Sequence, residues 1–207
     1  MKHYLDIKTW SRKNHFDFFK EFSEPFFGVT VEVDCSTVYN KVKREGKPVF
    51  LTYLYKSLIA VNKVENFRYR IEEGKVAVYD QVDPAPTVPR EDDTFGFSSF
   101  KFHSDYDKFI QAGAAAMAKV KKSANLDPST QPNVVQYSVL PWLSFTSNSH
   151  ARQLSHSDSV PKITFGKLER VEEKLKMPMS VHVNHALMDG YHVGQYVEYF
   201  QELLNQD

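Results

Sequence analysis

The residues best suited to catalysis form the pattern His-x-x-x-Asp-Gly, which runs from His185 to Gly190. Apolar and polar residues alternate over 179–185, which predicts a strand that ends at His185. A helical period follows to Leu204, and Asp189 stands where that helix needs its N-cap. A histidine at a strand end, four residues before a carboxylate, is a candidate general base, although such a histidine is more often a satisfied core residue.

The sequence lacks the residues that metal binding, phosphate binding by a glycine-rich loop, or a serine nucleophile elbow would require. The one cysteine, Cys35, excludes a site with several thiolates. His182 and His185 are three apart, so a strand places them on opposite faces and they cannot readily share a metal. We therefore expect no metal site. The glycine-rich phosphate loops and the Gly-x-Ser-x-Gly nucleophile elbow are also absent from the sequence.

Ser138 lies within the apolar run over 134–140, where the pattern predicts a strand. A buried hydroxyl needs a partner, so Ser138 either bonds to the backbone or faces a cavity. The sequence alone leaves both interpretations open, with the structural one favoured.

Length, charge and cysteine content restrict the class of protein. Its 207 residues fit a single domain, 1–207. Lys plus Arg and Asp plus Glu number 26 each, so bulk charge does not favour nucleic acid as a partner. No run of eighteen apolar residues suggests a membrane span, and one cysteine suits a reducing, cytoplasmic location. We expect a cytoplasmic protein with no nucleic-acid or membrane partner.

The predicted elements position these residues on a mixed sheet. Helices are predicted over 49–64 and 106–122, and a hairpin over 67–80 turns at Gly74. The segment 82–90 has three prolines, so we expect an edge strand or a connector there. Helices and strands interleave without regular alternation, which predicts an α+β fold: a large mixed sheet with helices largely on one side.

Four separated motifs resemble the chloramphenicol acetyltransferase family. The segment N-H-A-L-M-D-G-Y-H-V at 184–193 resembles the family signature H-H-x-x-x-D-G. W-S-R-K-N-H-F at 10–16 resembles its N-terminal segment, and Y-S-V-L-P-W at 137–142 resembles its S-A-L-P-W. V-D-P at 82–84, followed by T-F at 94–95, falls where the family has it. The resemblance extends over essentially the full chain.

The resemblance implies a fold and an activity. The family fold is a two-layer α+β sandwich with a large, mostly antiparallel or mixed sheet, assembled as a homotrimer with active sites between subunits. The implied enzyme is an acyltransferase of the antibiotic-resistance type, which transfers acetyl from the co-substrate acetyl-CoA to a hydroxyl of a small molecule.

The resemblance also implies residue roles. His185 matches the family's catalytic base, and Ser138 matches its oxyanion-stabilising serine. Asp189 matches a structural aspartate that pairs with an arginine, Arg12 here. Asn184 replaces the first histidine of the usual pair. Two further residues, by resemblance, lie near the coenzyme channel: Trp142 and Lys167.

The expected acceptor pocket departs from the resistance enzymes. Four wall positions that are largely apolar in that family are polar or basic here: Asn148, His150, Arg152 and Lys162. Phe18 and Phe19 keep an aromatic contribution, and Thr164 keeps a hydroxyl. An apolar acceptor would leave the basic groups unpaired, at about 1–3 kcal/mol each. We therefore predict an acceptor more polar than chloramphenicol, with anions among the candidates, unless the 147–159 loop turns these residues to solvent.

Two alternatives stay open. Dihydrolipoyl acyltransferases share the His-x-x-x-Asp-Gly motif and acylate a thiol, but this sequence has no lipoyl domain or Pro/Ala-rich linker. A non-catalytic ligand-binding relative is the other alternative, and retention of the four matched residues argues against it: His185, Ser138, Asp189 and Arg12.

Overall fold

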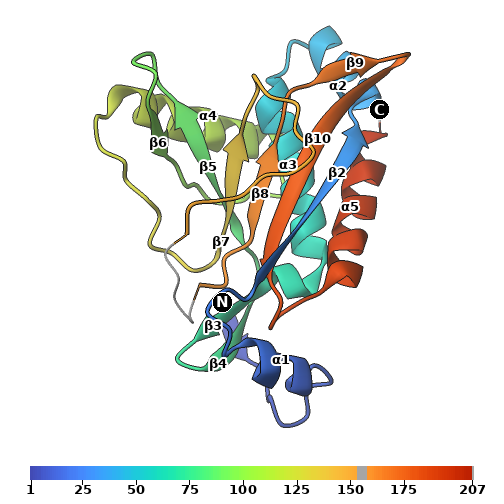
Figure 1. Cartoon of the computed structure of the whole chain (residues 1–207). Coiled ribbons are helices and arrows are strands. Elements are labelled where there is room, and N and C mark those ends of the chain that lie inside the picture. The colour runs from blue at the N-terminus through green and yellow to red at the C-terminus, as the bar shows by residue number, and fades with distance from the viewer. Residues whose placement is uncertain (153–157, 207) are drawn as a thin grey trace.

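The computed structural model describes residues 1–152 and 158–206. Its large sheet carries helices on one face, and a smaller sheet with α1 lies at one end (Figure 1). This two-layer α+β arrangement is the predicted fold class. The elements in chain order are β1 (Lys2–Tyr4), α1 (Lys13–Phe19), β2 (Phe26–Asp34), α2 (Ser36–Arg44), α3 (Val49–Lys63), the 3-10 helix η1 (Glu65–Arg68), β3 (Tyr69–Glu72), β4 (Lys75–Tyr79), β5 (Asp83–Pro89), β6 (Phe95–Phe97), α4 (Tyr106–Lys122), β7 (Val134–Val139), β8 (Lys162–Phe165), β9 (Glu169–Val171), β10 (Lys174–Asn184) and α5 (Gly190–Leu204).

The large sheet has the strand order β2-β10-β8-β7-β5-β6, with β9 paired to one end of β10. The β5–β7 and β7–β8 pairs are parallel, and the others are antiparallel. Odd-numbered strand residues such as Tyr137, Ile163 and Val181 join the core cluster that also contains α3 and α5 side chains. Because strand side chains alternate, the even-numbered residues of β7, β8 and β10 point to the face without helices, which we call the open face.

The prediction that 82–90 lies at an edge or in a connector is wrong, because β5 is an interior strand between β7 and β6. Its prolines are tolerated for a local reason. The carbonyl oxygens of Pro84 and Pro86 accept hydrogen bonds from the backbone N–H groups of Phe100 and Ser98. The N–H that each proline lacks would point to that same side, where the neighbouring segment supplies donors rather than acceptors.

A second hydrophobic cluster fixes the end of β10. The three-stranded sheet β1-β4-β3 packs with α1 and with the turn after β10. Phe16 from α1, Ile71 from β3 and Leu187 from the turn are buried in this cluster. The residue between strand and turn is His185, so this packing holds its backbone in place.

Within the described residues, no helix combines the length and hydrophobicity needed to span a bilayer.

Candidate functional site

His185 sits immediately beyond the last residue of β10. Its backbone N–H donates to the carbonyl oxygen of Pro25 at 2.8 Å. The ring of Phe19 stacks on the imidazole, with centroids 4.1 Å apart and planes inclined by 16°, and Phe27 lies at 4.6 Å. The imidazole Nδ1 is 3.1 Å from the Met188 carbonyl oxygen. With its proton on Nδ1 donated there, the neutral ring keeps a free lone pair on Nε2.

Arg12 and Asp189 brace the turn that follows His185. Arg12 Nη1 lies 2.6 Å from Asp189 Oδ2, and its Nη2 donates to the His185 carbonyl oxygen at 2.9 Å. Asp189 also caps α5, because its side chain accepts from the Tyr191 N–H. Partial burial works to raise the pKa of Asp189, but the Arg12 hydrogen bond and nearby positive charge lower it. This carboxylate therefore holds the backbone of the turn and does not contact the His185 ring through any hydrogen bond in the described structure.

Asn184, the residue before His185, is buried and ties two segments together. Its Nδ2 donates to the Asp158 carbonyl oxygen, and its Oδ1 accepts from the Ala186 N–H, both at 2.9 Å. The amide of asparagine carries a donor and an acceptor on the same carbon, and the imidazole of a histidine has no such group with which to make both contacts. The structure thus gives Asn184 a positioning task that the sequence did not reveal.

A row of hydroxyl side chains crosses the open face. Ser138 is in register with Thr164, and Thr164 with Ser180. Thr164 Oγ1 lies 3.3 Å from His150 Nε2, and the His150 and His182 rings meet edge to face at 4.9 Å. The row and the two rings form a polar layer under the loop that carries His150.

This layer is neutral and has unused hydrogen-bonding groups. Burial lowers the pKa of His150 to about 4, with His182 and Lys162 adding to the effect, and burial also lowers the pKa of His182. Within the described chain, two buried oxygens lack a hydrogen-bond partner: Asn148 Oδ1 and Ser180 Oγ. Buried polar atoms without partners are costly, so the layer is suited to a ligand with its own polar groups.

The predicted basic wall residues are already paired. Lys162 Nζ and Arg152 Nη2 lie 3.2 and 3.3 Å from the Asp158 carboxylate, and Arg152 also pairs with Glu24. The guanidinium of Arg152 lies 3.5 Å over the ring of Phe26. Burial lowers the pKa of Lys162, although Asp158 opposes that shift. Two carboxylates thus compensate two cations. Sequence analysis missed Glu24 and Phe26, which are distant in the sequence from Arg152 and Lys162. It also missed Asp158, although this carboxylate lies only four residues before Lys162 and was a signal that could have been used.

The remaining candidates are more exposed. Trp142 is 70% exposed and lies in a turn whose Leu143 carbonyl oxygen accepts from the Lys167 N–H at 2.8 Å. The Lys167 ammonium pairs with Glu169. Phe18 is 62% exposed, and its ring meets Phe19 and Phe22 rather than His185.

One chain does not bring Ser138 and His185 together. Ser138 is in register with Ser180 two strands away, and His185 lies five residues beyond Ser180. At about 3.3 Å per residue and 4.8 Å per strand, the two residues are roughly 15–20 Å apart. A single reaction centre that uses both would need them from different copies of the chain.

Comparisons with known proteins give consistent matches. A family model described as chloramphenicol acetyltransferase matches residues 2–201. Chloramphenicol acetyltransferase 3 of Escherichia coli is 31% identical over 204 residues, which cover 97% of this chain and 96% of the relative. A chloramphenicol acetyltransferase of Campylobacter coli is 31% identical over 206 residues, with 98% of each chain covered. A solved structure named chloramphenicol acetyltransferase aligns with a TM-score of 0.92 at 29% identity, covering 99% of this chain and 100% of that one.

Proposed function

The chain belongs to the chloramphenicol acetyltransferase family, and from this premise we propose that His185 is the general base in acetyl transfer from acetyl-CoA to a hydroxyl of a small polar acceptor. The family membership confirms the resemblance carried by the four sequence motifs. It also makes the protein an acetyl-CoA-dependent acyltransferase.

The observation that carries the proposal is the setting of the His185 ring. Phe19 stacks on the ring, and the Met188 carbonyl oxygen accepts a hydrogen bond from Nδ1–H, which leaves Nε2 as the basic atom. In the proposed step, Nε2 accepts the proton of the acceptor hydroxyl as its oxygen bonds to the thioester carbonyl carbon. The carbon–sulfur bond then breaks, and the proton leaves His185 with the coenzyme thiol.

We assign the oxyanion of this reaction to Ser138. Its hydroxyl would donate to the carbonyl oxygen as that oxygen gains negative charge. Arg12 and Asp189 act through the backbone and not on the reacting atoms, because they hold the turn and the His185 carbonyl oxygen. Their role is to position the base.

The separation of Ser138 and His185 supports a site shared between copies of the chain. Large apolar side chains are exposed in the segments that follow or flank both residues: Trp142 and Leu143 in the turn after β7, Phe18 beside Phe19, and Tyr191 at the start of α5. Exposed apolar groups of this kind favour contact with a partner surface. The proposed assembly is a homotrimer, in which each neighbour supplies one half of a site. The turn with Trp142, beside Lys167, is the proposed approach for the coenzyme.

The polar layer of the open face supports a polar acceptor. His150 and Thr164 offer hydrogen-bonding groups, and the partnerless oxygens of Asn148 and Ser180 would gain partners from hydroxyl or amide groups of a ligand. An anionic acceptor has less support than the sequence suggested, because Arg152 and Lys162 are compensated by Glu24 and Asp158. We propose a neutral, hydroxyl-rich acceptor.

Thiol release from acetyl-CoA, measured with separate acceptors, tests this function. The acceptor series comprises chloramphenicol, neutral polyols and amino alcohols, anionic hydroxy acids and dihydrolipoamide. We expect acceptor-dependent release with a neutral polar alcohol at a higher kcat/KM than with chloramphenicol, and loss of that release in His185→Ala with an unchanged Tm. A His185→Ala protein that keeps full acceptor-dependent activity would refute the role of the base, and dihydrolipoamide as the preferred acceptor would favour thiol acylation instead.

A further inference from the structure

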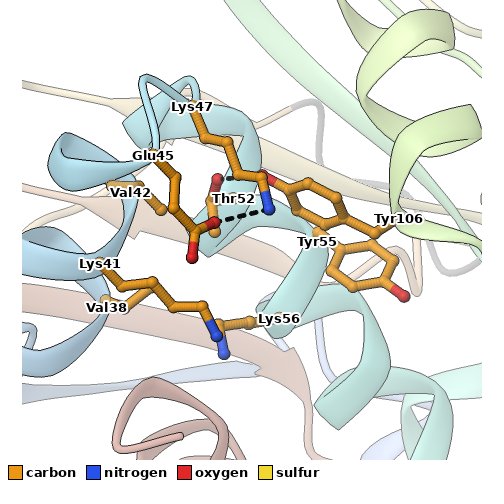
Figure 2. Close-up of a pocket in the computed structure, with 9 residues that line it drawn as sticks. All are labelled: Val38, Lys41, Val42, Glu45, Lys47, Thr52, Tyr55, Lys56 and Tyr106. Carbon is orange, nitrogen blue, oxygen red and sulfur yellow. Dashed lines mark hydrogen bonds and ion pairs between the residues drawn. The ribbon is translucent and has the colours of Figure 1, made fainter. Parts of the chain in front are cut away.

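A pocket of about 250 Å³ lies in the helical layer, on the other side of the sheet from the open face. Its walls come from α2, from the start of α3, from the loop between them and from the first residue of α4 (Figure 2). The lining residues are Val38, Lys41, Val42, Glu45, Lys47, Thr52, Tyr55, Lys56 and Tyr106. Neither His185 nor any member of the hydroxyl row contributes to it.

The charges in this pocket do not balance. Lys47 pairs with Glu45 at 2.6 Å and lies 4.9 Å from the Tyr106 ring centroid. The other two cations of the pocket are Lys41 and Lys56. Over 1–152 and 158–206, no carboxylate lies within 4.0 Å of either ammonium group. Figure 2 shows both ammonium groups ending beside one another on the same side of the pocket. The three lysines and one glutamate of the lining therefore leave two positive charges in excess.

Burial makes this arrangement costly without a ligand. Burial lowers the pKa of Lys56, and the charge of Lys41 lowers it further. Lys56 Nζ donates one hydrogen bond, to the Leu203 carbonyl oxygen at 2.6 Å, and an ammonium group has three protons to donate. Like charges in a partly desolvated site repel, and an anion between them removes that cost.

The other polar groups narrow the ligand class. Thr52 Oγ1 donates to the Pro48 carbonyl oxygen, so the Tyr106 hydroxyl 2.7 Å away donates to Thr52. The Tyr55 hydroxyl donates to the Ser104 carbonyl oxygen, so the hydroxyl protons of the lining are used and lysine ammonium groups are the donors available to an anion. Lys41 and Lys56 are the two that have no carboxylate partner in the described residues. Two uncompensated positive charges match a compact dianion, and phosphate groups are recognised in this way by lysine ammonium groups.

We propose that this pocket binds a small phosphate-type dianion at a site separate from the acetyl-transfer site. The probe is inorganic phosphate, titrated calorimetrically at about pH 8 and constant ionic strength, with chloride as the reference salt. We expect saturable binding of one phosphate per chain, and about 10-fold weaker binding in Lys41→Gln. Lys43→Gln is the matched control, because Lys43 lies on the same helix but is exposed over Tyr39.

Lys56→Gln is a second test and should also weaken phosphate binding by about 10-fold. Its loss of the Leu203 contact could lower stability, so binding is compared at a temperature where both proteins are folded. Absence of saturable binding, or equal affinity in wild type and Lys41→Gln, would overturn the proposal.

Two further measurements separate this site from the proposed enzyme chemistry. His185→Ala should bind phosphate as the wild type does, even though acetyl transfer is lost. Saturating coenzyme A should leave the phosphate affinity unchanged. Competition between coenzyme A and phosphate would contradict a separate site, whereas failure of acetyl transfer in every assay would leave the phosphate measurement intact.

Discussion

Phe19 lies flat against His185, with ring centroids 4.1 Å apart, and so limits the directions in which Nε2 can point. Phe19→Leu keeps an apolar residue but removes this stacked face. An aromatic contact of this kind contributes about 0.5–1.5 kcal/mol, so we expect kcat to fall roughly 2- to 10-fold with little change in KM for acetyl-CoA. Phe22→Leu is the control, since the Phe22 ring meets Phe18 and Phe19 but not His185. Equal rates in the two variants would argue against orientation by Phe19.

The Arg12–Asp189 pair gives a prediction for stability. Arg12→Leu leaves Asp189 without its cation and frees the His185 carbonyl oxygen. Breaking a buried pair costs about 3–5 kcal/mol, and partial exposure of Asp189 reduces the expected loss to about 1–3 kcal/mol in chemical denaturation. Lys13→Gln, which breaks an exposed pair with Asp17 on the helix surface, should lower the unfolding free energy much less than Arg12→Leu does, because solvent screens the exposed pair.

The same pair sets a pH dependence. The pKa of Asp189 is lowered in the folded protein, so its contribution to stability is present above the ordinary value of 3.8 and is lost as pH falls through the lower, folded value. The difference in unfolding free energy between wild type and Arg12→Leu should therefore shrink below pH 3.8. A difference that stays constant through this range would show that the charge on Asp189 does not matter.

His150 should make the protein sensitive to mild acid. Its pKa falls from 6.5 to about 4 on folding, so between these values the unfolded chain binds more protons than the folded one. Stability should then decrease as pH falls from 6.5 to 4, by on the order of 1–2 kcal/mol for a ring that is only partly buried. His150→Gln should show a shallower decrease in denaturant titrations over this range. His182 also has a lowered pKa, so the variant should retain part of the slope.

The sequence predicted the elements whose pattern is local. The helix over 106–122 forms with those bounds, and Asp189 caps α5 as predicted. The preceding strand ends at Asn184, one residue before the predicted end at His185. These features follow from periodicity and from capping chemistry, which short segments carry in full. The fold class followed from the order of the elements.

Features that depend on distant partners were harder to predict. The prolines of β5 suggested an edge strand or a connector. The sequence does not show toward which neighbouring segment the N–H groups that prolines lack would have pointed. Arg152 and Lys162 suggested an anion-binding wall, because their partner Glu24 is distant in the sequence. Asp158 is near both in the sequence, but only the fold shows that its carboxylate pairs with them. Asn184 appeared as a lost histidine, whereas its amide joins two backbone segments.

We propose that Ser138 and His185 of one reaction centre come from different copies of the chain. Each single variant, Ser138→Ala and His185→Ala, should be impaired, with Ser138→Ala reduced by about 100- to 1000-fold. The direct measurement is acetyl transfer by oligomers assembled from an equal mixture of the two variants after joint unfolding and refolding. Random pairing should restore both residues in about a quarter of the sites, and so about a quarter of wild-type activity. Activity no higher than the mean of the separately refolded variants, in oligomers shown to contain both chains, would contradict the claim.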